Sequence, residues 1–352
     1  MIWVTWRQCR ATIIAALSFI TLLIAVAAVA GPMTRKSETP DTFGNICSRW
    51  NDPVGGCRPE TALTITTLLA YMLPVLLGML VGVTVFSRDL EQRTHVLGFS
   101  QSVSRPWWYF SRVLVVFVPI SLAMSLLGLV LGWTRAPVPR HAVLWTSDSA
   151  PRLEFPLFET SGIVMGGYTF LALMVGSTLA LLLRSTLASM VLVLFGVPIL
   201  LVALTIAVRP NYAAPTIERQ DLDGYARSSE YGRAGSLERD TGWVVDKGFV
   251  DAAGAAVEVD FRACRAALPR VDYTERPGER EPERQARIRL LYDENVRAVD
   301  DCLRAQGADH YQIRYHRDGR FWRFQATETA LTLTLSALLL VPAMLGLRRL
   351  RP

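Results

Sequence analysis

The chain has 352 residues, of which 51% are hydrophobic and only 19% are charged, with a formal net charge of +6. Average soluble domains carry about 25% charged residues. This composition excludes a disordered chain, a coiled coil and a collagen, and it argues against an ordinary cytosolic enzyme. The mean hydropathy of +0.27 favours a membrane protein if the apolar residues are grouped in long runs.

The apolar residues are grouped in six runs of membrane length. A bilayer core of about 30 Å requires roughly 20 residues of α-helix. The six runs contain no Asp, Glu, Lys, Arg or His. We therefore predict six uncharged transmembrane helices, at residues 11–31, 62–86, 113–132, 160–183, 185–208 and 329–347. Because pumps and proton-coupled carriers need ionisable groups at membrane depth, the sequence argues against these two classes.

The first run has a second interpretation as a cleaved signal peptide. Arg7 and Arg10 precede it, and it ends in Ala28-Val29-Ala30, which is similar to a cleavage site. The apolar region of a signal peptide is only about 7–15 residues long, and this run is longer. We therefore expect the first run to be retained as a transmembrane helix.

The basic residues indicate an orientation in the cell membrane. If the N-terminal segment 1–10 is cytoplasmic, then 87–112, 184 and the tail 348–352 are cytoplasmic too. Ten of these 42 positions are basic, against seven of 57 in the short loops 32–61 and 133–159. The positive-inside rule then predicts cytoplasmic termini and an extracytoplasmic segment at 209–328. Since this asymmetry accounts for the basic pI near 9.2, we expect no nucleic-acid binding.

The segment 209–328 has the patterns of a small folded domain. Ile288, Leu291, Val299 and Leu303 follow helical spacing, as on the buried face of an amphipathic helix. Tyr311, Ile313 and Tyr315 alternate with polar residues, which is typical of a half-buried strand. We therefore expect a mixed α/β domain between the fifth and sixth helices.

Four of the five cysteines fall in segments predicted to be extracytoplasmic: Cys47, Cys57, Cys264 and Cys302. An even number in an oxidising compartment suggests the disulfides Cys47–Cys57 and Cys264–Cys302. Four free thiols are the alternative, and the sequence alone does not determine the pairing. No CxxC motif occurs and the four histidines lack zinc spacing, so we expect no metal site.

Aromatic side chains stand where the predicted helices meet the lipid headgroups, and we expect them to anchor the protein at these interfaces. A role in gating is the alternative for Trp322 and Phe324. The six residues are Trp3, Trp6, Trp107, Trp108, Trp322 and Phe324.

The cytoplasmic segment 87–112 carries the most specific motif of the chain. It contains Glu91, Thr94 and His95, followed by Gln101-Ser102-Val103-Ser104-Arg105. This segment resembles the coupling region of ABC-2 type exporter permeases, particularly an actinobacterial group. Arg93 is a departure, because that group usually has glycine there. Similar motifs occur at residues 1–8, 161–164, 183–186 and 302–303, and in Phe324, Gln325 and Glu328 before the last helix.

The resemblance implies an all-α polytopic fold with six transmembrane helices and a small mixed α/β extracytoplasmic domain between helices 5 and 6. It implies the permease subunit of an ATP-binding cassette exporter, whose partners are a separate ATPase subunit and a second permease copy, identical or paralogous. No GxxxxGK[ST] phosphate loop occurs in the sequence, so ATP and magnesium are expected on the ATPase and no cofactor on this chain. The expected coupling interface is Glu91, Arg93, Thr94, Leu97, Phe99, Gln101, Ser102, Val103 and Arg105.

An uncharged path between permease copies suits amphipathic or lipid-like cargo. The alternative function is a membrane sensor or anchoring protein whose outer domain binds a ligand or partner. A membrane enzyme that uses loop residues such as Asp148 or His141 is a weaker alternative, because isolated loop carboxylates are usually solvated.

Overall fold

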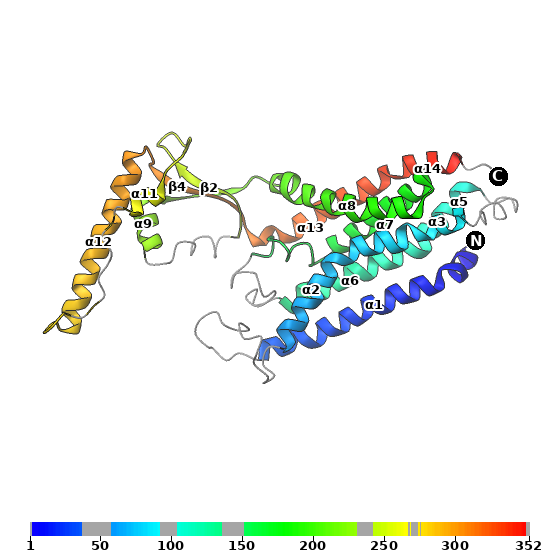
Figure 1. Cartoon of the computed structure of the whole chain (residues 1–352), viewed down its shortest axis with the longest axis horizontal. Helices are drawn as coiled ribbons and strands as arrows, with labels where there is room; N and C mark the ends of the chain where they lie inside the picture. The colour runs from blue at the N-terminus through cyan, green and yellow to red at the C-terminus, as the bar shows by residue number, and fades with distance from the viewer. Residues whose placement is uncertain are drawn as a thin grey trace. The chain divides into compact units, whose positions relative to one another are not determined.

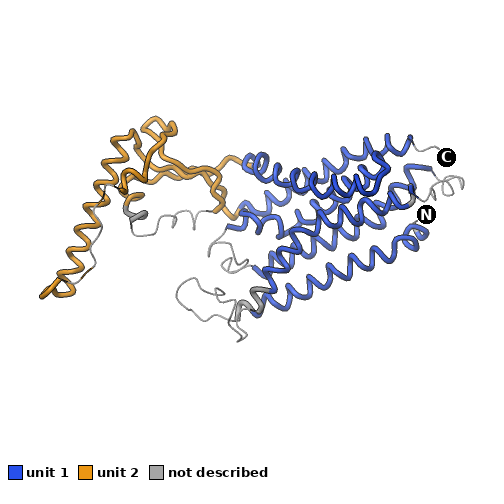
Figure 2. The backbone as a smooth tube through the Cα atoms, in the orientation of Figure 1, with its two compact units in different colours: residues 1–212, 320–352 blue, residues 213–319 orange. Residues whose placement is uncertain are grey.

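A computed structural model describes residues 2–36, 58–91, 104–135, 151–230, 242–266, 268, 274 and 276–349. The chain divides into two units, coloured separately in Figure 2. The helical unit consists of Met1–Tyr212 and Arg320–Pro352, and the smaller unit is Ala213–Gly319. The smaller unit is therefore narrower than the predicted segment 209–328, whose two ends belong to the helical unit.

Six helical segments among the described residues are long and apolar enough to cross a membrane, which confirms the expected number. The first, Trp3–Met33, lies in α1 (Ile2–Lys36). The second, Ala62–Arg88, joins α2 (Arg58–Leu77), the π-helical turn η1 (Gly78–Gly82) and α3 (Thr84–Glu91). The third, Arg105–Arg135, joins α5 (Arg105–Arg112), η2 (Val113–Phe117) and α6 (Val118–Arg135).

The remaining three segments follow the same plan. The fourth is α7 (Val164–Leu183). The fifth, Thr186–Asn211, joins α8 (Thr186–Ala203), the π-helical turn η4 (Leu204–Val208) and the 3-10 turn η5 (Arg209–Asn211). The sixth, Asp318–Arg348, joins η6 (Asp318–Arg320), α13 (Phe321–Leu338) and α14 (Leu340–Arg348).

The third and sixth helical segments begin earlier than predicted, at Arg105 and Asp318 instead of 113 and 329. Helix propagation depends on backbone hydrogen bonds and continues beyond the apolar stretch that hydropathy detects. As a result, these two segments contain charged residues that the predicted spans left outside.

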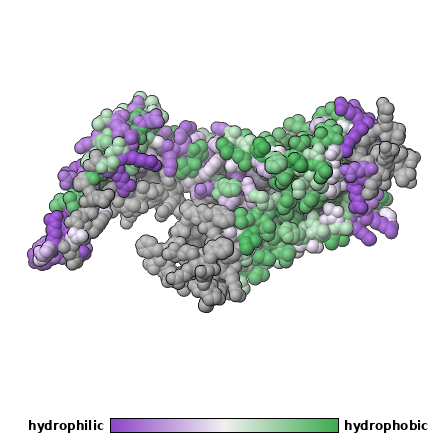
Figure 3. Space-filling model, viewed as in Figure 1, coloured by the Kyte–Doolittle hydropathy of each residue, from purple (hydrophilic) through white to green (hydrophobic). Residues whose placement is uncertain are grey.

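Helix α7 is the centre of the helical unit. It packs against α2, η1, α6, α8, α13 and α14, as Figure 1 lets the reader follow for α2, α6 and α8. In contrast, α8 exposes a row of large apolar side chains that includes Leu187, Val191 and Phe195. Figure 3 shows apolar residues over the middle of this unit and hydrophilic residues at the end where α14 finishes. This distribution fits a helical unit whose middle is surrounded by lipid.

The smaller unit contains an antiparallel four-stranded sheet in the order β1-β4-β2-β3. Its strands are β1 (Thr216–Asp221), β2 (Trp243–Val250), β3 (Ala256–Val257) and β4 (His310–His316). Thr216 pairs with Tyr315 in β4, and Trp243 pairs with His316 on its other side. Tyr311, Ile313 and Tyr315 are buried, which confirms the half-buried strand expected from their alternation.

Among the described residues, three helices accompany this sheet: α9 (Leu222–Glu230), α11 (Phe261–Ala266) and α12 (Glu281–Ala305). Of the predicted face of α12, Val299 and Leu303 are buried and Ile288 and Leu291 are half-buried. The predicted amphipathic helix is confirmed, and Val296 adds to its buried face. At its start, hydrogen bonds from Arg287 lower the pKa of the Glu279 carboxyl group.

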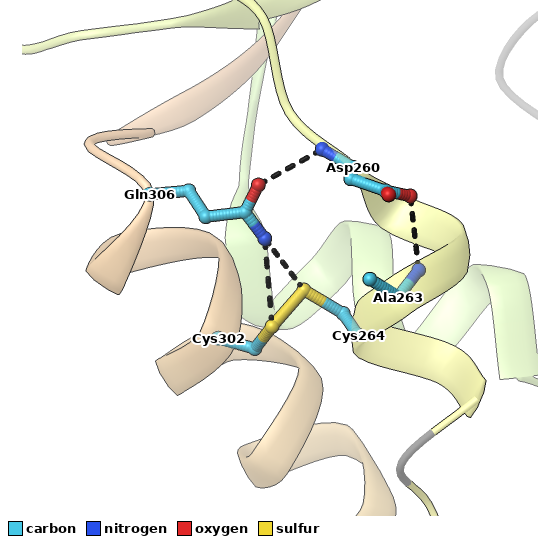
Figure 4. The surroundings of a disulfide bond; sticks show 5 residues. All are labelled: Asp260, Ala263, Cys264, Cys302 and Gln306. Atoms are coloured by element: carbon cyan, nitrogen blue, oxygen red, sulfur yellow. Dashed lines mark hydrogen bonds between the residues drawn. A yellow bond between two sulfur atoms is a disulfide. The ribbon is translucent and has the colours of Figure 1, made fainter.

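A disulfide joins Cys264 of α11 to Cys302 of α12. Figure 4 shows the Gln306 side chain beside it, with its amide nitrogen 3.0 Å from Cys264 Sγ and its oxygen accepting from the Asp260 backbone at 2.8 Å. The disulfide confirms one of the two predicted pairs. Cys47 and Cys57, the other predicted pair, lie outside the described residues.

Candidate functional site

Arg209 is 0% exposed and is the largest fully buried side chain of the described residues. It follows the π-helical turn η4 at the end of α8. A π turn contains one more residue than an α turn and so changes the direction of the side chains that follow it. The Arg209 guanidinium consequently lies inside the helical unit, in contact with α7 and α13.

The guanidinium binds two carboxylates that are distant in sequence. Its Nε and Nη2 atoms donate to Glu328 Oε2 and Oε1 at 2.9 and 3.0 Å, which is a bidentate pair. Its Nη1 donates to Glu159 Oε1 at 2.7 Å. Glu328 is 0% and Glu159 6% exposed. Charge-assisted bonds of this kind are strong and geometrically specific when they are shielded from water.

Neutral side chains complete this network. Arg209 Nη2 also donates to the Tyr168 hydroxyl at 3.2 Å and to Thr205 Oγ1 at 3.1 Å. The Tyr168 hydroxyl in turn donates to Glu328 Oε1. The guanidinium carbon lies 4.1 Å from the centre of the Phe158 ring, a cation–π contact. We call Glu159, Tyr168, Thr205, Arg209 and Glu328 the charge network.

The segment before α7 is held beside the charge network by Gln325 of α13. Gln325 Oε1 accepts from the Val164 backbone at 2.9 Å, and its Nε2 donates to the Phe158 carbonyl at 3.1 Å. Gly162 has a φ of +74°, and a Cβ there would lie 2.6 Å from Gln325 Oε1. Only glycine suits this position. The structure thus brings together residues 161–164 and 324–328, two separate motifs that resemble those of the family.

The charge network was not predicted from the sequence, because its three ionic residues stand one position outside the predicted helices. Glu159 precedes 160–183, Arg209 follows 185–208 and Glu328 precedes 329–347. The prediction of six uncharged transmembrane helices is therefore wrong for the fifth and sixth, because the segments Thr186–Asn211 and Asp318–Arg348 contain Arg209 and Glu328. One signal in the sequence was available. Because successive transmembrane helices cross the membrane in alternating directions, Glu159, Arg209 and Glu328 are all expected on the same side of it.

The two described ends of the predicted coupling interface contact other helices. Glu91 Oε1 accepts from Thr186 Oγ1, at the start of α8, at 2.5 Å. Arg105 Nη1 donates to the Arg348 carbonyl, at the end of α14, at 3.2 Å. The remaining interface residues lie outside the described residues: Arg93, Thr94, Leu97, Phe99, Gln101, Ser102 and Val103.

Arg112 is a second buried cation that hydropathy did not reveal. Its side chain is 3% exposed, donates to the Val85 carbonyl and lies 4.3 Å from the Trp108 ring centre. This residue therefore links α3 to α5 inside the unit, instead of facing headgroups.

The expected aromatic anchors divide into two groups. Trp3, Trp6, Trp107 and Trp322 are 44–67% exposed, whereas Trp108 is 6% and Phe324 0% exposed. Because Trp108 and Phe324 are packed inside the helical unit, they are not available to contact headgroups. Interfacial anchoring therefore remains a proposal for the exposed four only.

Comparison with protein families identifies this helical unit. The family model described as ABC-2 membrane transporter related matches residues 11–209, more than half of the chain. No curated protein and no solved structure shows a significant match. The chain belongs to the ABC-2 membrane transporter related family and is a multi-pass membrane protein. The family resemblance seen in the sequence is confirmed.

Proposed function

We propose that this chain is the permease subunit of an ATP-binding cassette exporter, coupled to a separate ATPase subunit. The observation that carries the proposal is the family match over residues 11–209, which includes the predicted coupling segment. A second permease copy, identical or paralogous, would complete the path, with lipid around the exposed apolar faces. ATP and magnesium would bind to the ATPase, not to this chain.

The described ends of the coupling segment support this mechanism. Glu91 is bonded to α8 and Arg105 to α14, so displacement of the segment would move two further helices with it. A nucleotide-driven closure of the ATPase could then be transmitted as a rigid-body movement. Glu91, Arg93 and Arg105 would provide charge complementarity in this contact, and Leu97, Phe99 and Val103 apolar surface.

We also propose cytoplasmic termini and an extracytoplasmic Ala213–Gly319 unit. Two observations support this orientation. Basic residues are enriched in the segments assigned to the cytoplasm, as the positive-inside rule requires. The smaller unit contains the Cys264–Cys302 disulfide, and disulfides persist mainly in oxidising compartments.

Affinity purification of the full chain from its host, in a mild detergent and with mass spectrometry, tests the exporter proposal. We expect an ATPase in near-stoichiometric amount. Glu91→Arg, or replacement of Leu97, Phe99 and Val103 by Ser, should remove it from the complex. Glu258→Arg is the matched charge reversal, because Glu258 is exposed in the smaller unit, and it should retain the ATPase.

Purification of the intact protein without any nucleotide-binding partner would contradict the exporter proposal. It would favour the sensor or anchoring protein. Retention of the ATPase by the Glu91→Arg and apolar-replacement variants would instead show that the coupling segment is not the contact.

A further inference from the structure

A cavity of about 260 Å³ opens at the surface of the helical unit beside the charge network. Its walls come from α2, from the segment before α7, and from α7, α8 and η4. Aromatic and aliphatic side chains form most of the lining, including Tyr71, Phe155 and Val202. Among the described residues that line it, Glu159 is the one that carries a charge. A mostly apolar cavity with one charged group is typical of a small-molecule site.

The two carboxylate oxygens of Glu159 differ in their surroundings. Oε1 accepts from Arg209 at 2.7 Å and lies 3.5 Å from Thr205 Oγ1. Oε2 is buried and has no hydrogen-bond partner among the described residues. A buried carboxylate oxygen without a donor is costly and uncommon. This oxygen therefore has the capacity to accept a hydrogen bond from a ligand.

The Glu159 carboxylate and the aromatic walls of the cavity favour a cationic donor. Within the charge network, one guanidinium faces two carboxylates, and it already binds both oxygens of Glu328. The nearby Arg135 donates to the hydroxyl groups of Thr67, Thr160 and Ser161. A neutral hydroxyl could satisfy Oε2, but an ammonium group would form a stronger, charge-assisted bond to the carboxylate. The aromatic walls would add cation–π attraction for such a cation.

We propose that this cavity binds a small primary or secondary ammonium ion with an aromatic or aliphatic body. The ammonium N–H donates to Glu159 Oε2, and the body lies against the apolar walls. The inference that this ligand is transported rests on the proposed function. The inference that the cavity binds it does not. The lipid-like cargo expected from the sequence is thus narrowed to lipophilic amines.

Binding is measured on the full chain in lipid nanodiscs, by titration calorimetry with two probes of equal shape. Phenylbutylamine is protonated at neutral pH, and phenylbutanol is its neutral counterpart. We expect saturable binding of the amine to the wild type, weakened about tenfold or more by Glu159→Gln. Binding of the alcohol should be weak and nearly unchanged by this substitution.

A second variant tests the location without touching the charge network. Val202 lines the cavity and is 46% exposed, so Val202→Trp should fill the cavity and abolish amine binding. Val191 is 52% exposed on the same helix and does not line the cavity. Val191→Trp is therefore the matched control and should bind the amine normally. Thermal unfolding of each variant verifies that it is folded.

Four results would overturn the proposal. Three are no saturable amine binding to the wild type, equal amine affinity in folded Glu159→Gln, and unchanged binding in Val202→Trp. The fourth is equal affinity of the wild type for amine and alcohol, which would show that Glu159 contributes no charge recognition. All these binding measurements are made without the ATPase. Amine binding can therefore be disproved while the exporter proposal stands, and the exporter proposal can be disproved while amine binding stands.

Discussion

Through its ion pairs, Arg209 connects the end of the fifth helical segment to α13 and to the segment before α7. Removal of the guanidinium would leave Glu159 and Glu328 buried without a counter-charge. Loss of one member of a buried ion pair typically costs about 3–5 kcal/mol. We therefore predict that Arg209→Met lowers the unfolding free energy of the purified protein by about that amount, measured by thermal or denaturant unfolding in detergent.

The triple variant Arg209→Met, Glu159→Gln and Glu328→Gln is the control for this prediction. Since it contains no uncompensated charge, it should recover part of the lost stability, as expected for residues that are energetically coupled. If Arg209→Met alone were as stable as the wild type, the charge network would not contribute to folding.

At the scale of the elements, glycines allow α7 to lie directly against η1. A Cβ at Gly176 of α7 would lie 2.4 Å from the Gly78 carbonyl oxygen, and one at Gly78 would lie 2.8 Å from the Ala172 oxygen. Small residues at such crossings permit close packing of membrane helices. Gly176→Ala should therefore destabilise the protein by about 1–3 kcal/mol, the usual range for overpacking.

Gly196 provides the matched control, because it lies in α8 and a Cβ there would meet nothing within 4 Å. Gly196→Ala should leave the unfolding midpoint unchanged or raise it slightly, since alanine favours helix formation. Equal effects of the two substitutions would indicate that helix propensity, and not the crossing, determines the result.

At the scale of the whole molecule, the orientation proposal makes a direct prediction for intact cells. Ala253→Cys, in the exposed turn after β2, should react with a membrane-impermeant maleimide added outside. Trp3→Cys, which is 67% exposed in α1, should react only after lysis. Both variants require a background without Cys9, Cys47 and Cys57.

Cys264 and Cys302 are an internal control in this experiment, because their disulfide should prevent labelling until a reductant is added. The opposite labelling pattern at Ala253→Cys and Trp3→Cys would contradict the proposed orientation. It would also remove the argument that the smaller unit lies in an oxidising compartment.

The sequence by itself determined the six transmembrane helices, the family, and the helix and strand around Val299 and Ile313. These features depend on local patterns: lipid requires long apolar runs, and a half-buried element requires a periodic one. The disulfide was suggested by the number of cysteines, but the contact of α11 with α12 was needed to confirm that Cys264 pairs with Cys302.

Only the tertiary structure decided which side chains meet around α7. Arg209 lies 50 residues after Glu159 and 119 residues before Glu328 along the chain. A hydropathy pattern treats each of them as the polar end of a separate helix. Likewise, Phe324 resembles an interfacial anchor in the sequence but is buried in the structure. The physical reason is that burial and ion pairing at helix ends are set by the packing of neighbouring helices, which a pattern along one helix does not contain.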